Sequence, residues 1–187
     1  AAHRLREAAA RSDSVPEGIP AYFVESLQFP YVEGLAFVLD AFKSGGWKAL
    51  DAVHANPPIS TEEILRPDRY RLRVAQGKSV PEPQTTQADG ELVTVLGEFH
   101  WSLLLGEYVG EGWGLDRVVI RRGKHGVTVL AETSWDSPND AREYSEAIAA
   151  LLERKKAKNV RTVTVGTKVL AAWGSDAKAI ASFVKKK

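Results

Sequence analysis

Four histidines are the first residues to consider for metal or acid–base chemistry, since the chain has no cysteine. They are His3, His54, His100 and His125. A zinc site on one helix needs two ligands four residues apart, and no pair of these histidines has that spacing. Glu98 and His100 are two residues apart, so their side chains lie on different faces of a helix. The spacing predicts no bound metal and no cofactor, unless the fold assembles a composite site from distant residues.

A glycine-rich turn holds a second candidate site. Gly110 to Gly114 contains three glycines around Trp113, and Asp116 follows two residues after Gly114. In one interpretation Trp113 packs between two halves of the protein and Asp116 accepts turn hydrogen bonds. In the other, Trp113 lines a ligand pocket in which Asp116 is the polar group. Glu98 and His100 complete this candidate ligand-binding set, and the sequence favours the packing role.

A proline-rich block contains residues that are expected to stabilise the local fold. It comprises Pro57, Pro58, Ser60, Thr61, Glu62, Glu63, Pro67 and Tyr70. The paired prolines stiffen a loop, and Ser60 with Glu63 three residues on predicts a capping box at a helix start. Pro67 ends that helix and Tyr70 supplies an aromatic anchor. The adjacent carboxylates at 62 and 63 are explained by capping and by the helix dipole. No residue of the block is assigned a catalytic role.

The same block carries a family resemblance. Its pattern resembles a signature of a bacterial family of zinc metallopeptidase-like proteins that are often exported. Further segments fit this pattern, namely Phe29-Pro30-Tyr31, Gly34, Gly45-Gly46-Trp47, Gly97-Glu98, Gly112-Trp113-Gly114, Asp116-Arg117, Trp135-Asp136 and Asp140-Ala141. The resemblance spans roughly Phe29 to Leu152.

The departures from that family concern its chemistry. Members carry a His-Glu-x-x-His helix upstream, which this chain lacks. Arg66 stands where the pattern has histidine, and Glu63 where it has glutamine. The resemblance therefore implies the C-terminal portion of such a protein, or a homologue that lost its metal centre. It also implies an exported location, periplasmic or extracellular.

Composition sets outer limits on function. The chain has 187 residues, 44% of them hydrophobic and 26% charged, with a net charge of +1. This balance gives no electrostatic case for a nucleic-acid or membrane-surface partner. Two basic clusters, Arg154–Lys156 and Lys185–Lys187, fall at predicted helix ends, where cations complement the dipole. No apolar run reaches the roughly 18–20 residues of a membrane span.

The first part of the chain, residues 1–110, is predicted to be mainly helical. Apolar residues recur at helical spacing from Tyr31 to Phe42, Pro30 suits a first helical position, and Gly45-Gly46 ends the helix. Residues 2–11 have helix-forming composition, residues 77–90 read as a loop, and Glu91 to Leu105 reads as one helix.

The second part, residues 111–187, is predicted to be a ββαββα unit. Two hairpins turn at Gly123–Gly126 and at Gly166-Thr167. Ser137 and Ser175 are the expected caps of the two helices. The expected fold is α+β, with the helical N-terminal part packed on a small, mainly antiparallel sheet that has its helices on one face.

Two functions follow from these patterns. The first is a non-catalytic metallopeptidase-like scaffold or docking portion, whose partner is an N-terminal segment outside this chain or another protein. The second is a free-standing ligand- or protein-binding module with a pocket near the Gly112–Asp116 turn. In either case the chain alone is not expected to be an enzyme.

Overall fold

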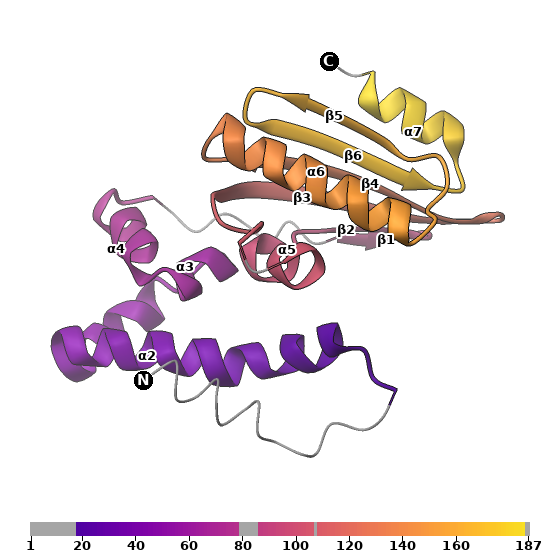
Figure 1. Cartoon of the computed structure of the whole chain (residues 1–187). Helices are drawn as coiled ribbons and strands as arrows, with labels where there is room; N and C mark the ends of the chain where they lie inside the picture. Colours follow the sequence, from indigo (N-terminus) through magenta and orange to yellow (C-terminus); the bar gives the residue numbers. More distant parts are fainter. Residues whose placement is uncertain (1–17, 79–85, 107, 186–187) are drawn as a thin grey trace. The chain divides into compact units, whose positions relative to one another are not determined.

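A computed structural model describes residues 18–78, 86–106 and 108–185 (Figure 1). The chain divides into two compact units, Ala1–Pro81 and Glu82–Lys187. The fold class is α+β, as predicted, with the helical unit N-terminal and an antiparallel sheet C-terminal. The helix expected at residues 2–11 lies outside the described residues, as does part of the loop expected at 77–90.

The described part of the helical unit, residues 18–78, has one long helix and two short ones. These are α2 (Ala21–Ala55), α3 (Thr61–Leu65) and α4 (Pro67–Ala75). α2 begins well before the expected start, so Pro30 lies inside it and not at a first helical position. The expectation for Pro30 was wrong because the preceding turns, from Ala21 on, are themselves helical. The proline removes one backbone N–H from the helix.

The glycine pair interrupts α2 as predicted. Gly45 and Gly46 have non-helical backbone angles, and Gly46 has a φ of 62°. That left-handed conformation suits glycine because it has no Cβ. A second helical segment follows from Trp47, whose ring meets that of Phe42 edge-on at 5.4 Å. The break therefore turns the chain while keeping these two aromatic side chains in contact.

The described residues of the sheet unit form a sheet of six antiparallel strands in the order β1-β2-β3-β4-β6-β5. Their bounds are β1 (Thr86–Ala88), β2 (Glu91–Thr94), β3 (Trp113–Gly123), β4 (Gly126–Trp135), β5 (Arg161–Val165) and β6 (Lys168–Gly174). The helices are α5 (Gly97–Leu105), α6 (Pro138–Arg154) and α7 (Ala177–Val184). From β3 onward the element order is the predicted ββαββα, and both expected hairpins are confirmed.

The single helix expected from Glu91 to Leu105 is a strand followed by a helix. Residues 91–94 form β2, which pairs with β3, and α5 begins only at Gly97. The apolar residues of this segment fit helical spacing, but the β-branched residues Val93 and Thr94 also suit a strand. They pair with Val119 and Val118 of β3, respectively. The two compact units divide between residues 81 and 82, whereas the switch from helical spacing to β-branched runs predicted a boundary near residue 110.

Helices cover both faces of the sheet. Alternate strand residues point to opposite faces, so neighbours Val118 and Val119 belong to different clusters. The first cluster, with Ala131 and Ala171, packs against α5 and α6 (Figure 1). The second, with Leu130 and Ala172, packs against Ile180 of α7. The prediction of helices on one face was wrong, because strand residues on both faces are apolar.

The N-cap of α6 is the predicted residue, whereas the N-cap of α7 differs from the prediction. Ser137 and Asp140 form a reciprocal capping box at α6, with Pro138 at the first helical position. At α7 the capping side chain is Asp176, which accepts from the backbone N–H groups of Lys178 and Ala179. Ser175, the expected cap, instead lies 3.4 Å from the Thr128 hydroxyl.

Candidate functional site

Asp116 lies at the centre of a buried polar cluster in the sheet unit. Its side chain is 2% exposed and stands on β3, where it reaches the start of α5. Oδ2 accepts from the backbone N–H of Leu96 at 2.9 Å and from Trp101 Nε1 at 3.1 Å, and Oδ1 accepts from the N–H of Gly97 at 3.2 Å. The carboxylate thus binds N–H groups that the first turn of a helix leaves without a partner.

Aromatic rings enclose this carboxyl group. Tyr144 meets Trp101 edge-on at 5.0 Å and Trp135 at 4.7 Å, and all three rings are buried. Trp113, also buried, belongs to the same cluster. Trp135 Nε1 donates to Thr133 Oγ1 at 2.8 Å. The rings and the carboxyl form one packed core between β3, β4, α5 and α6.

Burial governs the ionisation of this cluster. It raises the pKa of Asp116, while the N–H donors of Leu96, Gly97 and Trp101 act to lower that pKa. Burial also raises the pKa of Tyr144 well above its usual value, and the nearby Asp116 charge adds to this. Within the described chain, Trp113 Nε1 and the Tyr144 hydroxyl have no partner in hydrogen-bond geometry. Burial of the Asp116 carboxyl therefore disfavours its charged form.

The other two residues of the predicted ligand set lie on α5. Glu98 is 4% exposed at the first turn, and His100 is half-buried. His100 Nδ1 lies 2.7 Å from the Leu96 carbonyl oxygen, so this nitrogen carries the proton. Over the described ranges, no three His, Asp or Glu side chains are grouped in a way that could hold a metal ion.

The glycine-rich turn beside Asp116 is tightly packed. A Cβ added at Gly112 would lie 2.5 Å from Asp140 Oδ2, and one at Gly110 would lie 2.0 Å from Ser102 Oγ. The Gly112 carbonyl oxygen accepts from the Asp136 N–H at 2.7 Å. The glycines are needed because neighbouring atoms come this close. Side chains of α5 and α6, Ser102 and Asp140, therefore pack directly against this turn.

The proline-rich block encloses a buried ion pair in the helical unit. Glu63 Oε1 accepts from Arg73 Nε at 2.7 Å, and both side chains are under a tenth exposed. Arg73 also donates to Asn56 Oδ1 and to the Pro57 carbonyl oxygen, each at 2.7 Å. Tyr70 donates to the Asn56 carbonyl oxygen at 2.9 Å. One arginine on α4 therefore ties the proline loop to α3.

The sequence reasoning missed Arg73, because nothing local marks it as the partner of Glu63. The predicted capping box also had the Glu63 carboxylate accept from the Ser60 N–H, which differs from the bond observed. Ser60 does cap α3, accepting from the Glu63 N–H at 3.3 Å, so that prediction is confirmed. The Glu63 carboxylate, however, accepts from the Ile59 N–H at 3.0 Å and not from that of Ser60. Glu62 lies 3.7 Å from Arg69 in a more exposed ion pair.

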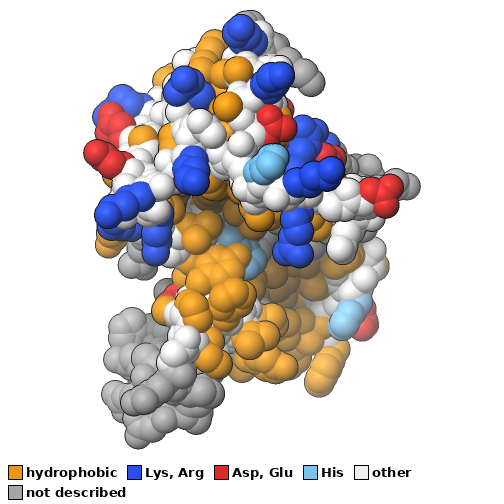
Figure 2. Space-filling model, turned by 90° about the vertical axis from the view of Figure 1, so that its right-hand side faces the viewer, with side chains coloured by type: hydrophobic (Ala, Val, Ile, Leu, Met, Phe, Trp, Pro, Cys, Tyr) orange, Lys and Arg blue, Asp and Glu red, His pale blue; other side chains and the backbone are white. Residues whose placement is uncertain are grey.

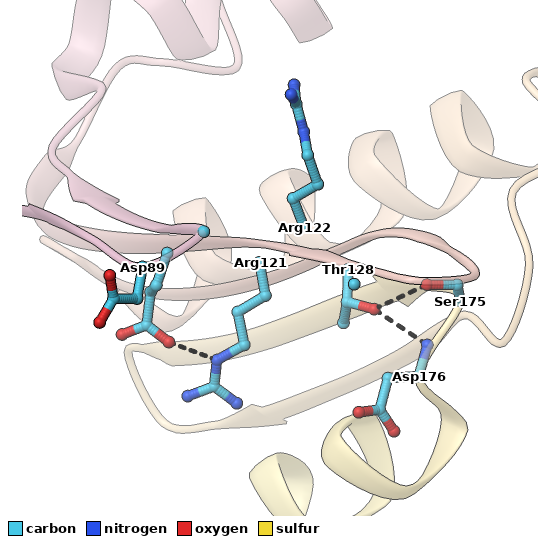
Figure 3. Close-up of a pocket in the computed structure, with 9 residues that line it drawn as sticks. Asp89, Arg121, Arg122, Thr128, Ser175 and Asp176 are labelled. Carbon is cyan, nitrogen blue, oxygen red and sulfur yellow. Dashed lines mark hydrogen bonds and ion pairs between the residues drawn. The ribbon is translucent and has the colours of Figure 1, made fainter.

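A shallow pocket of about 290 Å³ opens on the sheet unit, away from Asp116. Its charged and hydroxyl-bearing lining comes from the β1–β2 turn, the end of β3, β4 and the start of α7 (Figure 3). Arg121 pairs with Glu91, and Thr128 Oγ1 accepts from the Asp176 N–H at 2.9 Å. Arg122 points to the other side of the sheet from Arg121 (Figure 3). These polar groups mostly bind one another.

One face of α2 carries exposed hydrophobic side chains, which we call the α2 stripe. Its members are Phe23, Leu27, Tyr31, Leu35, Val38, Phe42 and Trp47. They are between 40% and 78% exposed. The spacing of three or four residues places the first six on one side of the helix, and Trp47 joins through its contact with Phe42. Figure 2 shows hydrophobic side chains gathered on the helical unit, while Lys and Arg are spread over the sheet unit.

A different face of α2 is buried. Phe29, Glu33 and Phe37 lie along it, and the Phe37 ring meets Tyr70 edge-on at 5.2 Å. The sequence pattern from Tyr31 to Phe42 correctly indicated a helix, but the side chains that carry that pattern are largely the exposed ones. No described helix is both long enough and apolar enough to cross a membrane.

Comparison with known proteins gives one match. Neither the curated proteins nor the solved structures contain a significant match to the chain. A protein family matches residues 86–181, from the first strand into α7, which is most of the sheet unit and over half of the chain. The chain belongs to this family, which is described as Domain of unknown function (DUF8575).

Proposed function

We propose that the chain is a non-catalytic docking protein, related to the metallopeptidase-like family it resembles in sequence and exported like members of that family. The observation that carries the proposal is the α2 stripe, a long row of apolar side chains left open on the helical unit. Monomeric proteins seldom expose apolar patches above roughly 300–600 Å², and larger ones mark interaction sites.

The placement of the polar residues supports a non-catalytic role. The buried groups most suited to chemistry, Glu63 and Asp116, both bind structural partners. Glu63 holds Arg73 and the Ile59 N–H, and Asp116 closes the start of α5. A general acid or base must reach a substrate proton in a cleft. Both carboxyl groups are instead enclosed by the protein.

An activity assay tests this role. The purified chain, with and without added zinc, is incubated with fluorogenic peptides of mixed sequence, beside the Glu98→Gln and His100→Ala variants. We expect all three proteins to give the same background signal. Cleavage by the wild-type chain that is lost in Glu98→Gln would contradict the proposal and would place an active site at α5.

A second candidate function is a ligand-binding module. The observation in its favour is the pocket near Arg121 and Asp176, whose volume is close to the lower limit of about 300 Å³ for ligand sites. Its mixed charges would suit a small polar molecule. A thermal-shift screen of small zwitterions and anions tests this, since a true ligand raises the melting temperature of the wild type and not of Arg121→Ala.

A further inference from the structure

We propose that the α2 stripe binds the α2 stripe of a second copy of the chain. The two helices would run antiparallel, with a two-fold axis between Gly34 and Leu35. This inference rests on the docking role proposed above and names the partner. Four features of α2 carry it: the order of the stripe residues, an open glycine, the direction of the helix dipole, and the exposed area.

The stripe is self-complementary about that point. Leu27 lies as far before the Gly34–Leu35 midpoint as Phe42 lies after it, and Tyr31 as far before as Val38 after. In an isologous two-fold interface, residue i contacts j and residue j contacts i. Antiparallel pairing therefore sets Leu27 against Phe42 and Tyr31 against Val38, twice each. Phe23 then approaches Trp47 of the second copy.

Gly34 leaves room for a close crossing at the axis. A Cβ built there would meet nothing within 4 Å, so the space in front of this glycine is open in the single chain. Helix axes that pack against one another lie roughly 8–10 Å apart, and the distance depends on the side chains at the crossing. Gly34 would accept Leu35 of the second copy, which is 42% exposed in the single chain.

The helix dipoles favour the antiparallel direction, because they oppose one another in that arrangement and would be aligned in a parallel one.

The exposed area of the α2 stripe is close to what a stable dimer buries. Large side chains of this kind bury about 150–250 Å² each, so the exposed fractions of the α2 stripe amount to roughly 800 Å². Standard protein interfaces bury about 800 Å² on each partner. The stripe alone therefore approaches what a specific interface uses, and its aromatic members are of the types that dominate binding energy.

The first experiment measures oligomeric state. Sedimentation equilibrium of the full chain should show a reversible dimer, and Leu27→Glu should weaken it about tenfold or more. Leu27 is 74% exposed, so this substitution should leave the fold intact. Leu115→Glu, at an exposed site on β3 of the sheet unit, is the matched control and should dimerise like the wild type.

The second experiment tests the direction. The chain has no cysteine, so single cysteines report on one site at a time. Leu35→Cys, beside the axis, should form a disulfide-linked dimer in a glutathione buffer. Leu27→Cys alone should not, because its two copies would lie about 22 Å apart along the helices. A mixture of Leu27→Cys with Phe42→Cys should give the mixed disulfide.

Two results would overturn the inference. Crosslinking of Leu27→Cys to itself would show a parallel arrangement, and a chain that stays monomeric at about 100 μM would show no pairing. In a monomeric chain, labelling of Tyr31 separates the two proposals. If the Tyr31 side chain of the monomer is labelled readily, the surface is free and only the self-pairing is overturned. If Tyr31 is protected from labelling in the monomer, the α2 stripe is covered within the chain and the docking role is overturned as well.

Discussion

Replacing Arg73 by methionine should destabilise the helical unit strongly. Arg73 makes its shortest bonds, each 2.7 Å, to Glu63, Asn56 and the Pro57 carbonyl oxygen. The substitution keeps much of the apolar stem but leaves the Glu63 carboxylate buried, with only the Ile59 N–H among these contacts. Breaking one side of a buried ion pair costs about 3–5 kcal/mol because the other charge stays desolvated. That is a large part of the 5–15 kcal/mol typical of a domain.

An arginine on the same helix that forms a surface ion pair with α2 provides the control. Arg71 bonds to Asp40 at 2.7 Å, but both side chains are about half exposed. Exposed pairs contribute about 0–1 kcal/mol, so Arg71→Met should change stability little. The double variant of Glu63→Gln with Arg73→Met should be less destabilised than the sum of the two single changes, since each single change leaves an unpaired partner.

The assay must report on the helical unit alone. Urea unfolding followed by circular dichroism at 222 nm gives the free energies, and hydrogen exchange of the α3 and α4 amides assigns them to this unit. We expect exchange there to accelerate in Arg73→Met while the amides of β3 and β4 stay protected. Equal stability of Arg73→Met and Arg71→Met would refute the reasoning, because it would mean that the Glu63–Arg73 pair is not buried.

Three further predictions concern single groups. Ser60→Ala should cost about 1 kcal/mol of unfolding free energy through loss of the α3 cap, whereas an unchanged melting temperature would contradict it. Tyr144→Phe should be neutral or stabilising by thermal melt, since the hydroxyl is buried without a partner, and a loss above about 2 kcal/mol would reveal a missed bond. Burial raises the pKa of Asp116 in the folded state, so the folded protein holds this proton more tightly than the unfolded chain. The stability of the wild type relative to Asp116→Asn should therefore be greatest below the unfolded pKa of about 4 and should fall as pH rises toward the folded pKa, and urea midpoints that diverge in the opposite sense would contradict this.

The sequence predicted most of the local structure, because local signals decide it. Gly45-Gly46, the Ser60 and Ser137 caps and the two hairpin turns each act within a few residues. The strand at Glu91–Thr94 was not predicted, because its identity depends on pairing with β3 more than twenty residues later. α7 lies on the second face of the sheet for the same reason, since its position depends on tertiary packing.

The candidate sites show the same division. Trp113 and Asp116 do come together with α5, but their partners Trp101 and Tyr144 could not be identified without the fold. Helical spacing in α2 indicated an apolar face, and spacing alone does not tell a buried face from an exposed one. The sequence therefore predicted the α2 helix, and only the structure showed which of its faces is open.

The most direct test of the docking role is hydroxyl-radical footprinting of the full chain, read by mass spectrometry over a range of protein concentrations. At high dilution the side chains of Leu27, Tyr31 and Phe42 should be oxidised readily, while the buried Phe37 stays protected. As complexes form, the three stripe residues should become protected together, and Leu115 of the sheet unit should stay labelled. Protection of Leu27, Tyr31 and Phe42 at every concentration would contradict the account, because the stripe would then be covered within the single chain and could not be a docking surface.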